Sequence, residues 1–334
     1  MEIRIKQSIV KSLSEKLFKF NLLEMNRNRP EININAEYDY LVTMWLCLAG
    51  ICHNTRGLYG RIQGNLYKGW DYLSLRFTIL LMENPMFFEP GNLVLVTGTE
   101  LAEALKDDKG VFRIRDIDRR AELLADIGYR LMRDYDSKAS LILEGSGGYM
   151  IRDNGLGVYQ QLEKFEAFRD PERKKSTVFI MLPYEAGRFE IKDPENLEPI
   201  VDYHMMRGLL RNGAIDIDDA TFRLLTSGKK VDTMIESEIR KKAKIIVKNF
   251  VETTGKSVFN LNWIMWNLYR SCCRMDKPAC DTCKIFNDKN DYCSFATVVD
   301  YPCTGQCPLS DICLAATDKE RRKLKEPVID TEYY

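Results

Sequence analysis

Eight of the ten cysteines in this sequence of 334 residues lie within one short segment, from Cys272 to Cys313. Thiolates are the usual ligands of iron–sulfur clusters and of structural zinc sites. Cysteines that only fill a core are normally scattered, and a secreted disulfide scaffold would be short and would spread its cysteines along the chain. Because a long ordinary segment with only Cys47 and Cys52 comes first, the pattern indicates a metal site in a reducing cytoplasm.

The spacing of these cysteines is specific enough to name candidate ligands. Cys280 and Cys283 form a C-x2-C pair that places two sulfurs on one tight turn, and more distant cysteines can close the site. Spacing by itself does not choose between zinc and an iron–sulfur cluster. Cys272 and one further cysteine can be bystanders. The candidate ligands are Cys273, Cys280, Cys283, Cys293, Cys303, Cys307 and Cys313.

A carboxylate and two lysines lie where polar turns open predicted helices. Asp202 begins the segment DYHMMRGLLRNG, which is predicted to be a helix ended by Gly213. An aspartate at a helix start is favoured as an N-cap, and the spacing alone favours that role over catalysis. Lys174 and Lys175 lie in the turn DPERKKST, where a solvated charge is the commoner outcome for either lysine singly.

Aromatic and basic side chains near these turns are candidates for holding a substrate. Tyr59, Tyr67 and Trp70 belong to the stretch RGLYGRIQGNLYKGW, for which the glycines predict a loop or a short hairpin. A flipped or free base is commonly held between aromatic faces, although aromatic residues more often fill a core. Tyr203, His204 and Arg207 follow the aspartate, where the imidazole could orient the carboxylate and the guanidinium could hold a phosphate.

Helical periodicity dominates the elements that must position these residues. Helices are expected near the N-terminus, over 71–83 and from 116 to about 135, and small loops over 141–157. Trp263 and Trp266 are assigned to the core of the last helix before the cysteines. The prediction is a mainly α fold with few strands. Its expected parts are an N-terminal helical part over 1–157, a helical catalytic part over 158–270, and a cysteine-rich loop with a charged tail over 271–334.

The composition excludes several classes of protein. The 49 basic side chains balance 49 acidic ones, and 45% of the residues are hydrophobic, which excludes a disordered chain. It also excludes binding to nucleic acid through bulk positive charge, so any phosphate contact must come from a local patch. The longest nearly apolar run, Leu41 to Ile51, is too short to span a bilayer, and the N-terminus lacks the apolar core of a signal peptide. We expect a cytoplasmic protein without a membrane partner.

The order of three motifs resembles the helix-hairpin-helix (HhH-GPD) base-excision DNA glycosylases, in particular the iron–sulfur branch typified by endonuclease III. The motifs are the lysine turn DPERKKST, the segment VDYHMMRGLLRNG, and C-x6-C-x2-C after a Trp-rich helix. The resemblance implies a helix-hairpin-helix fold and a [4Fe–4S] cluster, with zinc or a second cluster as alternatives. Two ligand sets stay open, Cys273, Cys280, Cys283 and Cys293, or a set that recruits Cys303, Cys307 and Cys313.

A longer stretch, roughly residues 40–270, is similar to the queuosine salvage N-glycosidases. The similar segments are YKGWDYL, RRAELLADIGYRLM, FEAFRDPERKKSTVF, VDYHMMRGLLRNGAI, LLTSGKKVDTMIESEIRKKA and LNWIMWNL. That family releases queuine from a free nucleotide or nucleoside, has a helix-rich fold related to the DNA glycosylases, and usually lacks an iron–sulfur tail. This chain therefore combines features of both families.

Both resemblances imply cleavage of an N-glycosidic bond. The transition state is oxocarbenium-like, and a fixed carboxylate stabilises its charge and orients or deprotonates the attacking water. Asp202 occupies the position of that carboxylate. In bifunctional glycosylases a lysine attacks C1′ and forms a Schiff base, and Lys174 or Lys175 falls where that lysine would lie. We expect hydrolytic release of a modified purine-like base, in DNA as in base excision repair.

Two alternatives stay open at this stage. The first is a nucleosidase that acts on a free modified nucleotide, favoured by the neutral net charge and the longer stretch of similarity. The second is a non-catalytic iron–sulfur protein that binds nucleic acid or senses redox state. The expected partner is therefore DNA or a modified nucleotide, and the sequence gives no oligomeric state.

Overall fold

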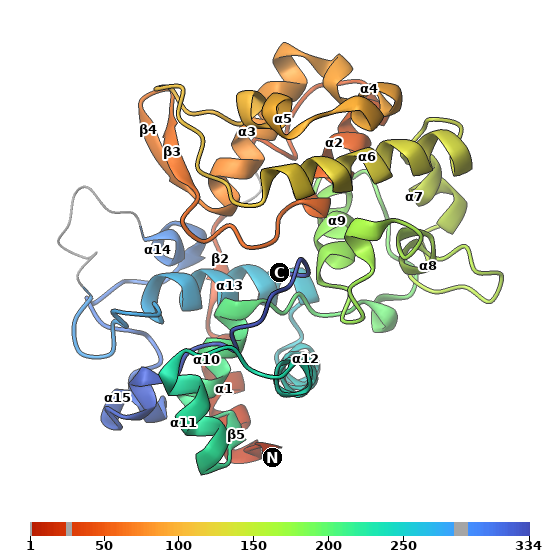
Figure 1. The fold of residues 1–334 in the computed structure, drawn as a ribbon. Coiled ribbons are helices and arrows are strands. Elements are labelled where there is room, and N and C mark those ends of the chain that lie inside the picture. Colours follow the sequence, from red (N-terminus) through yellow and green to blue (C-terminus); the bar gives the residue numbers. More distant parts are fainter. Residues whose placement is uncertain (1, 25–28, 284–292) are drawn as a thin grey trace. The chain divides into compact units, whose positions relative to one another are not determined.

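The computed structural model describes residues 2–24, 29–283 and 293–334, and it is mainly helical, as the periodicity predicts (Figure 1). The chain divides into two compact units, and each is described by itself. Unit 1 comprises residues 1–26 and 198–331, and unit 2 comprises residues 27–197 and 332–334. This division differs from the boundaries expected at 157 and 270, because helices on both sides of residue 157 pack together and the cysteine-rich segment packs against helices that precede it.

Unit 1 is built on three helices, α10, α12 and α13, which contact one another. The short antiparallel pairs β1–β5 and β2–β6 join the start of the chain to the end of α10 and to the cysteine-rich segment, with Ile3 opposite Ile217 and Leu22 opposite Val299. The elements of unit 1 are β1 Ile3–Ile5, α1 Gln7–Phe18, β2 Asn21–Leu22, α10 Tyr203–Asn212, β5 Ile215–Ile217, α11 Asp219–Ser227, α12 Thr233–Thr254, α13 Val258–Cys272, α14 Ser294–Val298, β6 Val299–Asp300 and α15 Leu314–Thr317.

Helix α10 begins and ends where the sequence predicts. Asp202 is its N-cap and Gly213 its C-cap, with φ of 90° at the glycine, a backbone conformation that costs other residues energy. Gly208, in the middle of the helix, lets α10 approach α13 closely. A Cβ added there would lie 2.3 Å from the ring of Tyr269. The glycine therefore sets the distance between the two helices that carry the candidate site.

Unit 2 surrounds the apolar helix α2, whose residues from Leu41 to Gly50 are all buried. Helix α2 contacts α3, α6 and α9, and strands β3 and β4 form the predicted hairpin. The residues over 141–157, expected to be small loops, lie partly in helix α7. The elements of unit 2 are α2 Tyr38–Gly50, β3 Tyr59–Ile62, β4 Asn65–Lys68, α3 Trp70–Glu83, α4 Pro90–Leu95, α5 Gly98–Ala104, α6 Ile117–Asp134, α7 Ser140–Ser146, α8 Val158–Leu162 and α9 Lys174–Glu185.

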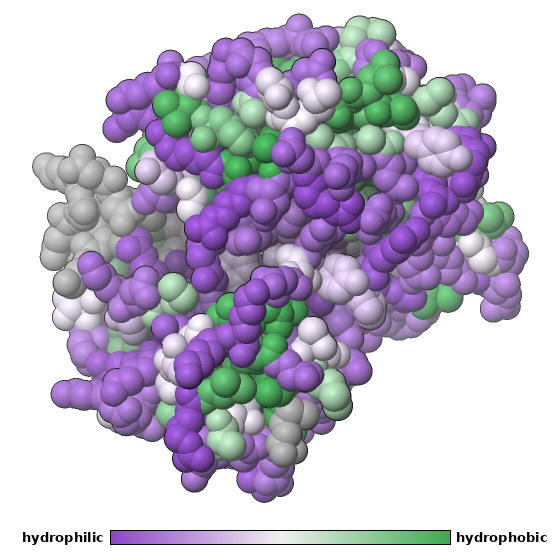
Figure 2. Space-filling view, viewed as in Figure 1, coloured by the Kyte–Doolittle hydropathy of each residue, from purple (hydrophilic) through white to green (hydrophobic). Residues whose placement is uncertain are grey.

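The surface is largely hydrophilic in the view of Figure 2, as the many charged residues of both signs lead one to expect. Among the large apolar side chains that stay exposed are Met82 of α3 and Leu95 of α4. No helix within the described ranges is long and apolar enough to cross a lipid bilayer.

Candidate carboxylate and thiol sites

Both carboxylate oxygens of Asp202 accept hydrogen bonds inside unit 1. Oδ1 accepts from the backbone N–H of Met205 at 3.0 Å, and Oδ2 accepts from Nε1 of Trp266 on α13 at 3.1 Å. The side chain belongs to a residue that is only 7% exposed. The N-cap role that the sequence favoured is confirmed, but it uses one oxygen only. The second oxygen is held by an indole that helix capping does not require.

Trp266 is a site residue that the sequence reasoning assigned to the core. It is half-buried, and the guanidinium of Arg270 lies over its ring at 4.2 Å from the centroid. Trp263 is buried as expected and meets Trp266 edge-on at 5.9 Å. An indole N–H in a packed helix usually finds a hydrogen-bond acceptor. This preference was the one feature of the sequence that pointed to a polar partner for Trp266. The sequence could not say that the acceptor is the carboxylate of Asp202.

His204 and Tyr203 lie beside the carboxylate in the first turn of α10. The rings of Tyr203 and His204 are 4.3 Å apart, and His204 is 6.5 Å from Trp266. Nδ1 of His204 is 2.8 Å from Nη2 of Arg207. The N-terminal end of α10 thus gathers a carboxylate, an imidazole, a phenol and an indole, which are groups that can bind a sugar and a base or carry a proton.

Arg207, the expected phosphate contact, is buried and bonded to protein groups. It is 2% exposed, its Nη1 pairs with Glu326 at 2.7 Å, and its Nε donates to the carbonyl of Cys273 at 2.7 Å. A buried guanidinium that is paired with a carboxylate holds protein segments together. Arg207 therefore ties α10 to the start of the cysteine-rich segment and to residue 326.

Arg211, one turn further along α10, organises the same segment. Its guanidinium donates to the carbonyls of Arg274 at 2.6 Å, Met275 at 2.7 Å and Leu324 at 2.8 Å. Its Nη1 also lies 3.7 Å from the sulfur of Cys273. The C-terminal half of α10 therefore fixes the backbone that leads into the candidate metal ligands.

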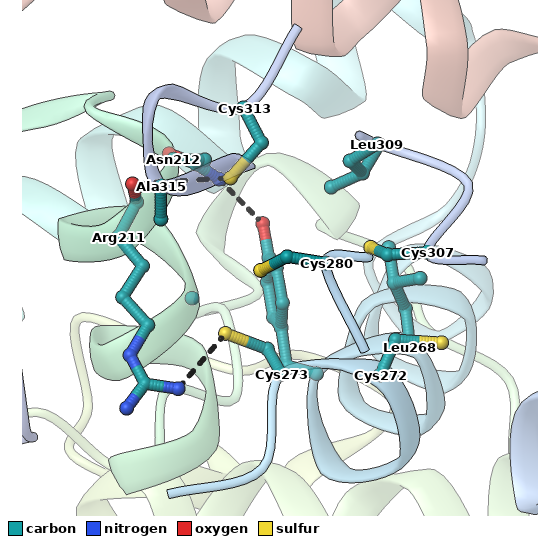
Figure 3. Close-up of a pocket in the computed structure, with 12 residues that line it drawn as sticks. Arg211, Asn212, Leu268, Cys272, Cys273, Cys280, Cys307, Leu309, Cys313 and Ala315 are labelled. Carbon is teal, nitrogen blue, oxygen red and sulfur yellow. Dashed lines mark hydrogen bonds between the residues drawn. The ribbon is translucent and has the colours of Figure 1, made fainter. Parts of the chain in front are cut away.

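Five cysteines line one pocket in unit 1 (Figure 3). The pocket has a volume of about 20 Å³. In the same measure, one water molecule needs about 10–15 Å³. Its apolar wall includes Leu268, Tyr269 and Leu309. Of the seven predicted ligands, four line it, and Cys272, which the sequence left as a bystander, lines it as well. The five are Cys272, Cys273, Cys280, Cys307 and Cys313.

The thiols that line this pocket are donors of the kind that bind a thiophilic metal. Sulfur ligands with an apolar surround are the chemistry of iron–sulfur clusters and of structural zinc. Burial raises the pKa of Cys280 to about 11 and of Cys313 to about 12, and the neighbouring Cys273 contributes to both. Over the ranges that the structure describes, no three Cys, His, Asp or Glu side chains surround a single point as ligands of one metal ion do.

The predicted lysines are buried at the start of α9 in unit 2, which corrects the expectation of solvated charges. The Nζ of Lys174 lies 3.1 Å from the sulfur of Cys52, and the Nζ of Lys175 donates to the carbonyl of Gly50. Burial lowers the pKa of Lys175 to about 7. Arg120 donates to the next carbonyls, those of Ile51 and His53. These cations lie where α2 ends and its carbonyl groups lack helical partners.

Trp70 and Tyr67 also belong to unit 2. The indole of Trp70 hydrogen-bonds to the side chain of Glu31. Glu31 is buried, and this burial raises the pKa of its carboxyl group. Glu31 is a residue that the sequence reasoning missed, since nothing local marks it. In the hairpin, Tyr67 pairs with Gly60 and not with Tyr59. Because neighbouring positions alternate between the two faces, the two tyrosines project from opposite faces and cannot hold one base between them.

Comparison of the sequence with protein-family models and with curated proteins finds no match. The geometry of each unit is therefore the basis for any functional conclusion. In unit 1 this geometry joins Asp202, Tyr203 and His204 with Trp266 at one end of α10, and a group of cysteines at the other. The lysines, Trp70 and Tyr67 lie in unit 2.

Proposed function

We propose that this protein is a cytoplasmic N-glycosidase of the helix-hairpin-helix type that hydrolyses the bond between a sugar and a modified purine-like base. The observation that carries the proposal is the buried carboxylate of Asp202, held between the N–H of Met205 and the indole of Trp266. A carboxylate fixed in a site of low dielectric stabilises developing positive charge without having to reorganise. Positive charge on the sugar is what departure of the base creates.

Asp202 acts in this proposal as the carboxylate that faces the sugar and directs a water to C1′. The hydrogen bonds from Met205 and Trp266 fix the orientation of its two oxygens. His204 and Tyr203 lie next to it and supply a proton donor or acceptor and an aromatic surface for the substrate. Met205 and Trp266 have a different role, because they position the carboxylate and do not take part in the reaction.

We propose a [4Fe–4S] cluster with a structural role, bound by Cys273, Cys280, Cys307 and Cys313. Such a cluster would cross-link the segment after α13 to the segment before α15. Arg211 anchors the first of these segments to α10, the helix that carries Asp202. The cluster would thus stabilise the framework of the carboxylate from the far end of that helix.

We propose water, and not a lysine, as the attacking group. Lys175 has the lowered pKa that a nucleophilic amine needs. Its amine is nevertheless engaged by a backbone carbonyl where α2 ends, and that of Lys174 by a thiol. A hydrolytic enzyme leaves no Schiff base, so borohydride treatment during turnover is expected to trap no complex. A trapped complex that is lost in Lys175→Met would instead establish lyase activity.

DNA is the substrate we would test first, and a free modified nucleotide is the second candidate. One observation favours the free modified nucleotide. Arg207, the predicted phosphate contact on the helix of Asp202, is buried and bonded to protein groups, and so is Arg211 on the same helix. Duplex DNA binding at moderate salt separates the two substrates, because affinity for DNA depends on phosphate contacts that a small-molecule hydrolase does not need.

The decisive experiment compares Asp202→Asn with wild-type protein on damaged DNA oligomers and on free modified nucleotides. Asparagine caps helices as well as aspartate does, so the variant should fold while losing the charge. We expect base release to fall by about 100-fold or more, the usual effect of removing one preorganised charge-stabilising group.

Asp232→Asn is the matched control, because Asp232 also caps a helix of unit 1, accepting from Met234 N–H at 2.7 Å. It should leave base release unchanged. Equal rates for Asp202→Asn and wild type would overturn the catalytic role of Asp202. If neither protein releases a base from any substrate and both bind nucleic acid, the result would favour the non-catalytic iron–sulfur alternative.

A further inference from the structure

The β3–β4 hairpin of unit 2 (Figure 1) has one packed face and one exposed face. On the packed face Ile62 is buried, and a Cβ added at Gly60 would meet the ring of Tyr72 at 2.6 Å. Residues at the alternate positions project to the other side of the hairpin, which we call the outer face. The outer face consists of two directly opposed pairs, Tyr59 with Lys68 and Arg61 with Leu66, and all four residues are exposed.

The loop over 105–115 is fastened along this hairpin. The backbone N–H of Asp108 donates to the carbonyl of Arg61 at 2.9 Å, and the Asp108 carboxylate accepts from the N–H of Gly64 at 2.8 Å. The guanidinium of Arg113, also in the loop, lies over the ring of Tyr59 at 4.8 Å from its centroid. The loop therefore adds its charges to those of the outer face.

The hairpin segment 54–69 and the loop 105–115 together are strongly basic. They contain seven basic and two acidic side chains, in a chain whose total charges balance. Both acids are engaged by the protein, because Asp108 caps the hairpin turn and Asp107 accepts from Arg113 at 2.8 Å. This is the local positive patch that contact with phosphate groups requires in a protein of zero net charge. The basic residues that are exposed are Arg56, Arg61, Lys68, Lys109 and Arg115.

An exposed aromatic ring among these cations indicates what the patch binds. Proteins that hold single-stranded nucleic acid combine cations that contact the phosphates with aromatic side chains on which bases stack. Tyr59 is 48% exposed even with Arg113 over its ring, and both a phenol ring and a guanidinium plane can stack on a base. A lipid surface would require several apolar side chains to insert, whereas the outer face has only Leu66.

We propose that the outer face and the loop 105–115 bind a single strand of DNA. Tyr59 would stack on a base, and Arg61 and Lys68 would contact phosphates on either side of it. The proposal rests on the proposed function only in the choice of DNA over another nucleic acid, since no step of the argument uses Asp202. The surface would hold a strand by stacking and charge, without reading its sequence.

The test is the binding of a fluorescent oligothymidylate of about 16 nucleotides to full-length protein, measured by anisotropy at several salt concentrations. Arg61→Gln with Lys68→Gln should weaken binding and reduce the slope of log affinity against log salt by about 1.4, since each phosphate contact on a single strand contributes about 0.7. Tyr59→Ala should weaken binding by about 5- to 140-fold and leave the slope unchanged, because stacking releases no counterion. Tyr59→Phe should bind as wild type does.

Arg133→Gln with Lys138→Gln is the matched control, because it removes the same two charges from unit 2. Arg133 lies in the last turn of α6 and Lys138 follows that helix, whose 18 residues span about 27 Å from the end that adjoins the loop. The control should bind the oligomer as wild type does. Equal salt slopes for the two double variants would overturn the proposal, and so would full affinity in Tyr59→Ala.

Two further outcomes would also overturn it. One is a wild-type protein that binds no oligothymidylate at low salt. The other is binding to vesicles of anionic lipid, without binding to DNA, that is lost in Arg61→Gln with Lys68→Gln. Asp202→Asn should bind the oligomer with wild-type affinity. Loss of base release in that variant, or its absence in wild type, is therefore distinguishable from failure of this surface to bind DNA.

Discussion

Single residues in this protein owe their chemistry to where they are buried. Lys174 and Lys175 lie in a turn rich in charge, yet both amines are enclosed in unit 2 and face the end of α2. An ammonium group loses hydration on burial, and its pKa falls as a result. The pKa of Lys175 falls from 10.5 to about 7, mainly for this reason. The lysine therefore makes stability depend on pH.

Lys175→Met should remove that pH dependence. Below pH 7 both states carry the ammonium, and its burial costs stability in full. Between about pH 7 and 10.5 the folded state binds fewer protons than the unfolded state, so the free energy of unfolding rises with pH. From pH 7 to pH 9 the wild type should gain about 2 kcal/mol relative to Lys175→Met, measured by urea unfolding at each pH. A constant difference between the two proteins would show that the pKa of Lys175 is not lowered.

Helix α10 is the element that joins the two candidate sites of unit 1. Its N-cap is the proposed catalytic carboxylate, and its last turn holds Arg211 against the segment that carries the first thiol ligand. Such a helix transmits position only if it is tightly packed along its length. Gly208 provides that packing, because the ring of Tyr269 occupies the space where a side chain would begin.

Gly208→Ala should destabilise the protein despite the higher helix propensity of alanine. The added Cβ would meet the buried Tyr269 ring at 2.3 Å, and overpacking of this kind costs about 1–3 kcal/mol. Gly91→Ala in α4 is the control, because a Cβ there meets nothing within 4 Å and should be neutral or stabilising by up to about 1 kcal/mol. Urea unfolding of the three proteins checks this. Similar values for both variants would mean that α10 can move away from α13.

At the scale of the whole molecule, the cysteines concentrate in one of the two units. The segment 273–313 belongs to unit 1, and its described residues, 273–283 and 293–313, hold few regular elements, the short α14 and β6 among them. A segment with so little secondary structure depends on cross-links for its order. Metal is therefore expected to stabilise one unit selectively.

Removal of the proposed metal by chelation under reducing conditions should loosen unit 1 locally. Hydrogen exchange measured by mass spectrometry should become faster over 273–313 and at the end of α10, where Arg211 holds residues 274 and 275. Peptides from residues 29–197 should exchange as before, since these residues belong to the other compact unit. Faster exchange throughout both units would instead mean that the metal supports the entire fold.

The sequence by itself determined the local features. Helix α10, with Asp202 as its cap and Gly213 at its end, the β3–β4 hairpin, the buried α2 and the concentration of thiols follow from capping, periodicity and turn chemistry, which act over a few residues. Only the tertiary structure decided which groups meet. Trp266 reaches Asp202 from 64 residues away, and Cys307 and Cys313 share the pocket of Cys273. These contacts depend on how the helices pack, and local spacing in the sequence does not encode the packing of distant segments.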